Sequence, residues 1–189
     1  MPVLQSIGSD ALRAFGFGVG GGAVLASYEL ITTTVLAANA TTVTFNLPAG
    51  TTTTYKHLQF RGAILTTVAP GEVRVYKNAI TSGYWAHFME GNGTTVTSNY
   101  SATQPGFYFS YEGAQRTSSS PLPFVLDFLD YANASKNLTV RGFSGAAGSA
   151  VRLISSSLAD TATPTSYTFT LTTGQYAIGT RISLYGVRA

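Results

Sequence analysis

The sequence predicts an all-β protein, an antiparallel β-sandwich of jelly-roll type with an extended glycine-rich N-terminal arm. Three observations lead to this prediction. Between residues 28 and 189, short segments alternate apolar and polar residues, Gly, Pro and Asn separate these segments at regular spacing, and no long segment has a helical period. Many short strands with such turns are typical of sandwiches. We therefore expect an arm at residues 1–27 and one sandwich domain at residues 28–189.

The first part of the sandwich is predicted to open with a pair of strands at residues 28–37 and 41–47. In the second of these, Val43, Phe45 and Leu47 alternate with polar residues, so we expect them to face the core. Further strands are expected at residues 55–67, 72–77, 83–88, 94–101 and 107–112. Gly91-Asn92-Gly93 predicts a hairpin turn between the strands on either side of it.

Residues 124–131 are apolar on both faces apart from Asp127 and Asp130. This pattern fits a central strand or a short helix, and we favour the strand. Tyr167 and Phe169 alternate with threonine near the end of the chain, which predicts a half-buried strand. The later strands are expected at residues 137–143, 150–158, 166–172 and 179–189.

The composition limits the partners that we expect. Charged residues make up 10% of the chain, against about 25% in an average globular protein. The net charge of +3 comes from scattered Lys and Arg, and nucleic-acid binding needs clustered basic residues, so we expect no nucleic-acid partner. The apolar N-terminal run is too short to span a bilayer, and we expect no membrane partner. The absence of cysteine excludes disulfides and thiolate metal sites.

No pattern in the sequence indicates catalysis. The two histidines, His57 and His87, have no metal-binding spacing such as HxH or HExxH. Asp127 and Asp130 are three residues apart on the predicted strand, so they point to opposite faces. Residues 16–21 match GxGxxG, but they follow no strand and open no helix. We therefore expect no catalytic residue, no metal and no cofactor, and a protein that is not an enzyme.

Aromatic residues concentrate between residues 84 and 111. They fit two interpretations. One is an inward face of the core or a subunit interface; the other is an exposed surface that stacks on sugar rings, since an aromatic ring offers flat apolar area with a polar edge. The candidates for contact with a glycan or a protein partner are Tyr84, Trp85, His87, Tyr100 and Tyr108.

Residues 1–27 combine apolar side chains with many glycines and have no clean period. A cleaved signal peptide is an alternative, but Asp10 lies in its supposed positive region and five glycines interrupt its supposed apolar helix. We favour an arm that docks on another protein. The predicted anchors are Leu4, Ile7, Leu12, Arg13, Phe15 and Phe17.

Several segments resemble a group of tailed-bacteriophage virion surface proteins. They are the opening Tyr28-Glu-Leu-Ile-Thr-Thr-Thr, the middle Asn99-Tyr-Ser, and above all the ending Gly179-Thr-Arg-Ile-Ser-Leu-Tyr-Gly-Val. The lead Ile7-Gly-Ser-Asp-Ala-Leu-Arg-Ala-Phe-Gly-Phe is similar to N-terminal pieces of phage structural proteins. The resemblance implies a β-sandwich module, often trimeric, that is mounted on a phage head or tail.

Together these points predict a structural protein of a phage virion, a capsid decoration (cement or head-fibre) protein on the particle surface. Its partners would be the major capsid protein or another virion protein, with further copies of the chain in a homotrimer. Two alternatives stay open. One is a short tail-fibre or receptor-binding module that contacts host-surface glycan, and the other is a secreted lectin-like carbohydrate-binding domain.

Overall fold

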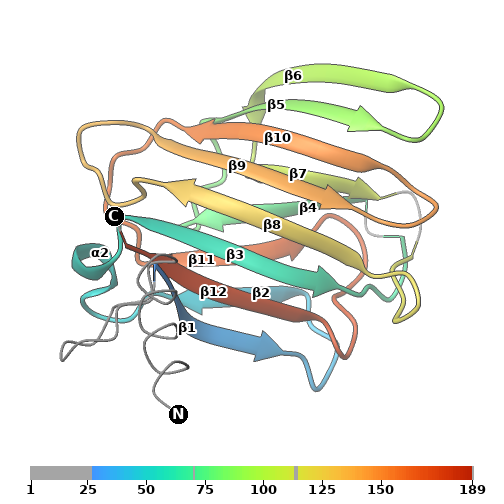
Figure 1. Cartoon of the computed structure of the whole chain (residues 1–189), viewed down its shortest axis with the longest axis horizontal. Helices are drawn as coiled ribbons and strands as arrows, with labels where there is room; N and C mark the ends of the chain where they lie inside the picture. The colour runs from blue at the N-terminus through green and yellow to red at the C-terminus, as the bar shows by residue number, and fades with distance from the viewer. Residues whose placement is uncertain (1–26, 70, 113–114, 189) are drawn as a thin grey trace, which may run out of the picture.

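The computed structural model describes residues 27–69, 71–112 and 115–188. Two antiparallel sheets pack face to face, and Figure 1 views the larger one from its outer face. The larger sheet has the order β1-β12-β3-β8-β9-β10-β5-β6 and the smaller one β2-β11-β4-β7. The strands are β1 (Tyr28–Val35), β2 (Thr42–Asn46), β3 (His57–Ile64), β4 (Gly71–Lys77), β5 (Tyr84–Gly91), β6 (Val96–Gln104), β7 (Phe107–Glu112), β8 (Leu122–Leu129), β9 (Leu138–Gly145), β10 (Val151–Leu158), β11 (Ser166–Leu171) and β12 (Arg181–Val187).

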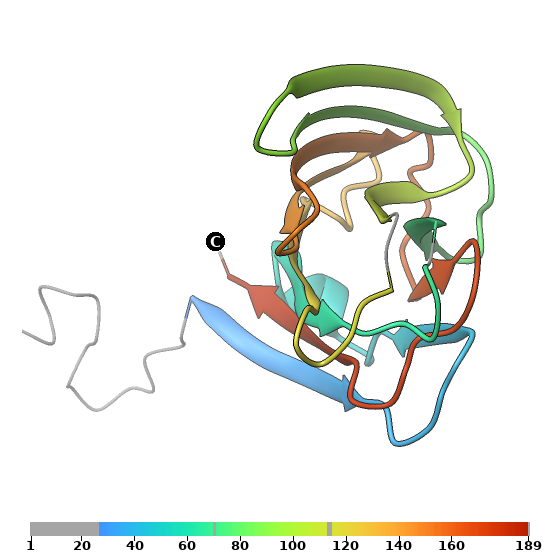
Figure 2. The same cartoon turned by 90° about the vertical axis from the view of Figure 1, so that its right-hand side faces the viewer.

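The predicted all-β sandwich is confirmed, and its core has jelly-roll topology. The orders β1-β12-β3-β8 and β2-β11-β4-β7 are those of two interlocked Greek keys. Two hairpins are added to this core. The β5–β6 hairpin lies between β4 and β7 in the chain, the β9–β10 hairpin lies between β8 and β11, and together they continue the larger sheet beyond β8. We call β9, β10, β5 and β6 the sheet extension; Figure 2 shows it at the top of the sandwich.

Local predictions are largely confirmed. Residues 122–129 form a strand, and the turn after Gly91 joins a hairpin. Val43 and Phe45 face the core, as the alternation predicts. The helix α2 (Thr51–Thr54) is short, and no helix in the described part of the chain is long and apolar enough to cross a membrane.

The predicted opening pair is wrong. β1 pairs with β12 in the larger sheet, and β2 pairs with β11 in the smaller one. The connecting residues bond to the β11–β12 connection instead of closing a hairpin: Leu36 N donates to Thr180 O at 3.0 Å, and Ala40 N donates to Tyr176 O at 3.0 Å. Both connections therefore cross from one sheet to the other at the same end of the sandwich.

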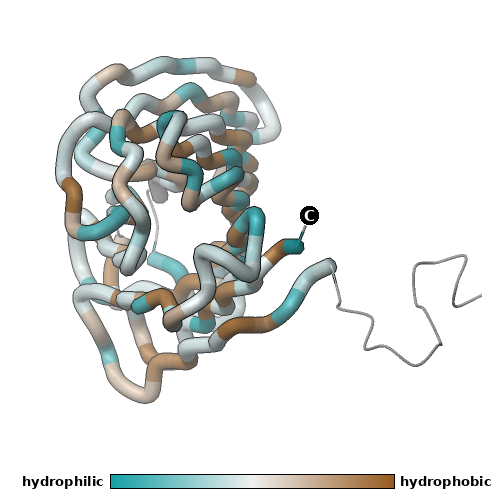
Figure 3. Tube along the Cα trace, turned by 90° about the vertical axis from the view of Figure 1, so that its left-hand side faces the viewer, coloured by the Kyte–Doolittle hydropathy of each residue, from teal (hydrophilic) through white to brown (hydrophobic). Residues whose placement is uncertain are grey.

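Aromatic side chains join the two sheets. The Phe60 ring on β3 makes edge contacts with Phe45 at 5.2 Å and Phe169 at 5.1 Å, both from the smaller sheet. The ring centres of Phe128 on β8 and Tyr167 on β11 are 4.6 Å apart. Figure 3 shows the alternation behind this packing, with apolar residues placed between polar ones along the strands. Such ring pairs add about 0.5–1.5 kcal/mol each beyond the area that they bury.

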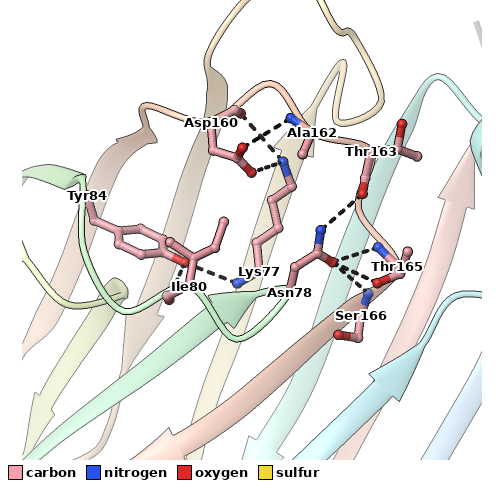
Figure 4. Close-up of polar contacts among 9 residues, drawn as sticks. All are labelled: Lys77, Asn78, Ile80, Tyr84, Asp160, Ala162, Thr163, Thr165 and Ser166. Atoms are coloured by element: carbon pink, nitrogen blue, oxygen red, sulfur yellow. Dashed lines mark hydrogen bonds and ion pairs between the residues drawn. The ribbon is translucent and has the colours of Figure 1, made fainter.

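A polar cluster ties the two chain segments where the sheet extension joins the core (Figure 4). Lys77, at the end of β4, has a side chain only 1% exposed and pairs with Asp160, which follows β10, at 2.6 Å. Asn78 Oδ1 accepts hydrogen bonds from Thr165 N at 2.7 Å and Ser166 N at 3.2 Å. The Tyr84 hydroxyl accepts from Lys77 N at 3.1 Å and donates to Ile80 O. We call these contacts the loop clamp, because they join the β4–β5 loop to the β10–β11 loop.

The loop clamp also sets the charge state of Asp160. Burial alone would raise the pKa of this carboxyl group. The hydrogen bonds from Lys77 and from Ala162 N, with the Lys77 charge, outweigh burial and lower the pKa below its ordinary value. A lowered folded-state pKa stabilises the protein above the unfolded pKa of about 3.9, and this contribution is lost as pH falls through the folded value.

Asp160→Ala is expected to lower the free energy of unfolding by about 3 kcal/mol at pH 7, because it leaves the buried Lys77 ammonium group without its partner. The loss should shrink below about pH 4, where the wild-type carboxylate itself becomes protonated. Urea unfolding at several pH values measures both effects. A cost that does not change with pH would contradict this role of the ion pair.

Candidate functional site

The outer face of the larger sheet carries a hollow of about 830 Å³, which we call the outer groove. Its lining comes from β5, β6, β8, β9 and β10, so it lies mainly on the sheet extension. The outward-facing lining residues are Met89, Val125, Phe143 and Leu153, which are apolar, and His87, Ser98, Tyr100, Asp127, Arg141 and Ser155, which are polar or amphipathic.

Strand register places the apolar residues in one row across four strands. Val125 on β8 is opposite Phe143 on β9, Phe143 is opposite Leu153 on β10, and Leu153 is opposite Met89 on β5. Cross-strand neighbours of this kind have Cβ atoms about 5 Å apart. The row is therefore a continuous apolar strip that runs perpendicular to the strands.

This strip is unusually exposed for apolar side chains. Met89 is 54% exposed, Phe143 49% and Leu153 53%, and the neighbouring row adds Val96 and Val151. Single exposed apolar residues are normal on a protein surface, whereas a contiguous group indicates a surface that binds another molecule. The exposure follows from the topology, because the smaller sheet packs on the opposite face of the larger sheet.

A polar row runs beside the apolar strip. Arg141 Nε pairs with Asp127 Oδ2 at 3.2 Å, and Gln59 Nε2 donates to Asp127 Oδ1 at 2.5 Å. Farther toward β1, the Arg61 guanidinium lies 5.1 Å from the ring centres of Tyr28 and Tyr185. Asp127 and Arg141 thus form the charged border of the groove, and the Arg141 side chain remains 66% exposed.

The inner face of the sheet extension packs against β7, the edge strand of the smaller sheet. This packing covers an edge that would otherwise be open. Arg152 on β10 lies over the Phe88 and Tyr108 rings, at 4.6 and 4.9 Å from their centres, and it also bonds to Glu90 and to the Tyr108 hydroxyl. Burial raises the pKa of Tyr108 to about 12, against the opposing effect of Arg152. The groove therefore lies on a rigid, buried support.

The structure brings together three of the five predicted contact residues. Trp85, His87 and Tyr100 line a smaller hollow that adjoins the outer groove, together with Ser155 and Ser157. The His87 and Tyr100 rings are 4.5 Å apart. Tyr84 and Tyr108 instead belong to the buried interior, and burial raises the pKa of Tyr84 to about 12 as well. The predicted anchors of the N-terminal arm lie outside the described residues.

Sequence reasoning missed the apolar half of the groove. In Val151-Arg-Leu-Ile154, apolar residues occur on both faces of the strand. This pattern indicates that each face contacts apolar surroundings. The pattern cannot say which face is covered. Leu153 is outward and Ile154 inward because the sheet extension has the rest of the sandwich on one side only.

Within the described residues, no group of three or more His, Cys, Asp or Glu side chains could hold a metal ion. The chemistry of the groove is thus that of an apolar strip with a charged border. No protein-family model matches the chain, and neither a curated protein nor a solved structure matches it.

In the chain without residues 1–26, Phe143→Ser combined with Leu153→Ser is expected to change the free energy of unfolding by about 1 kcal/mol or less, since both side chains are half exposed on the sandwich. Phe124→Ser, on the inward face of β8, should cost about 3–5 kcal/mol, because it opens a cavity beside Phe109 and Phe169. Urea unfolding of both variants measures the difference. Equal losses would contradict the assignment of the groove to a free outer face.

Proposed function

We propose that the chain is a structural protein of a tailed-phage particle, which decorates the capsid surface as a homotrimer and binds the major capsid protein or another virion protein. The observation that carries this proposal is the outer groove, with its row of Val125, Phe143, Leu153 and Met89. A contiguous exposed apolar strip on a rigid sheet suits a protein that works by adhering to other proteins. The setting on a phage particle comes from the sequence resemblance.

The charge-poor composition supports the same role. A surface with few charges loses little solvation energy when it is buried against a neighbour. At the rim Asp127 already pairs with Arg141, so a partner that leaves this rim in water need not supply a charge to match it. The groove can therefore be covered at low electrostatic cost.

The size of the apolar surface bears on how the protein would attach. The four side chains of the row, with Val96 and Val151, form an exposed apolar patch on the order of 600 Å², at the upper end for a single protein. At about 25 cal/mol per Å², its burial contributes on the order of 15 kcal/mol, against about 4–15 kcal/mol for association itself. Docking of the groove alone gives at most moderate affinity, which favours a second attachment through the anchors in residues 1–26.

Phe143→Ser with Leu153→Ser is expected to reduce binding to purified particles at least tenfold, and deletion of residues 1–26 should also abolish attachment. The matched control is Ile178→Ser, which removes an apolar side chain that is 61% exposed but lies outside the groove. Cosedimentation with particles measures bound protein. Undiminished binding of the groove variant would overturn the role of the groove, and undiminished binding of the deletion would overturn the role of the arm.

A receptor-binding module that contacts host glycan is the second candidate. The observation that favours it is the hollow with Trp85, His87 and Tyr100, where rings lie beside the serine hydroxyls of Ser155 and Ser157. Rings supply flat apolar area for a sugar face, and hydroxyl groups supply hydrogen bonds to its edges.

Trp85→Ala with Tyr100→Ala is expected to slow adsorption of particles to host cells about tenfold if the protein binds glycan, because stacking area is lost. Adsorption kinetics measure this, with heat stability of the particles as the second readout. An unchanged adsorption rate would eliminate the receptor-binding candidate, and a simultaneous loss of heat stability would support decoration.

A further inference from the structure

An occupant of the outer groove would lower the tendency of the free protein to aggregate, because a contiguous exposed apolar surface of this size is an aggregation liability. The groove is hollow, so the same face of a second copy would not fill it, since two hollow faces meet only at their rims. A single extended segment, by contrast, can lie along the row from Val125 to Met89.

The chain itself contains a segment with matching chemistry. In Phe15-Gly-Phe-Gly-Val19, the apolar side chains recur at every second residue and glycine fills the positions between them. In an extended backbone, Phe15, Phe17 and Val19 would all project from one side, with no side chain on the other. Such a segment can place an apolar face on the groove without exposing another apolar face to water.

The dimensions also match. The apolar row crosses four strands, from β8 to β5, and spans about 14 Å at about 4.8 Å per strand spacing, while residues 15–19 in extended form span about 13 Å. From β8 to β1 is again about 14 Å, and the nine residue steps from Val19 to Tyr28 reach up to about 30 Å. The chain can thus connect the groove to the start of β1 without strain.

We propose that in the free protein residues 15–19 of the same chain lie in the outer groove, with Phe15 toward Met89 and Val19 toward Val125. The short connection gives the segment an effective concentration on the order of millimolar at its own groove, well above that of a neighbouring chain in dilute solution. Binding to a particle would then exchange this internal contact for contacts with the lattice, and the groove and the arm would become available together.

This inference goes beyond the proposed function and is tested on the purified full-length protein alone. The chain has no cysteine, so a disulfide between two introduced cysteines reports contact between those two positions alone. In the variant with Val19→Cys and Val125→Cys, mild oxidation in dilute solution is expected to give a fast disulfide within one chain. The control pairs Val19→Cys with Leu30→Cys. Leu30 lies on β1 two residues from its start, is 54% exposed and is outside the groove, so a segment without a preferred site would react with it at least as fast.

Equal rates for the two pairs, or disulfide-linked dimers in place of the internal disulfide, would overturn the proposal. A second measurement leaves the sandwich residues unchanged. Phe15→Ser with Phe17→Ser is expected to raise the fluorescence of a dye that binds apolar surfaces several-fold, because it uncovers the groove, and an unchanged signal would also overturn the proposal. Either failure leaves the particle-binding results standing, so it is distinguishable from failure of the proposed function.

Discussion

The unequal size of the two sheets is the constraint on which the candidate site depends. A sheet of eight strands packs against a sheet of four, and the β9–β10 and β5–β6 hairpins account for the difference in strand number. The inner face of these hairpins packs around β7 and buries Arg152 against Tyr108, whereas their outer face has no layer of the described chain above it. A jelly-roll core without the two hairpins would lack the outer groove.

The loop clamp is what makes this arrangement stable at the point where the hairpins leave the core. The β4–β5 loop leads into the β5–β6 hairpin, and the β10–β11 loop follows the β9–β10 hairpin. The buried Lys77–Asp160 pair joins these two loops. Breaking such a pair costs more than its formation contributes, because it leaves a charge in the interior. The clamp therefore couples the position of the sheet extension, and so the geometry of the groove, to the folded core.

Alternation within strands was predictable from the sequence, and pairing between strands was not. Val43 and Phe45 face the core as expected, because one parity of that strand is apolar and the other is threonine or asparagine. In Tyr84-Trp-Ala-His-Phe88, both faces of the strand carry aromatic or imidazole rings. The pattern therefore cannot show that Tyr84 is buried while Trp85 and His87 face outward. The pairing of β1 with β12 joins residues that are 146 to 159 positions apart in the sequence, and no local pattern encodes it.

The proposed attachment to a phage particle through the outer groove can be observed by imaging the protein on the particle at side-chain detail. We expect Phe143, Leu153 and Met89 to contact a neighbouring virion protein. A particle on which the protein is bound with this face open to solvent would contradict it.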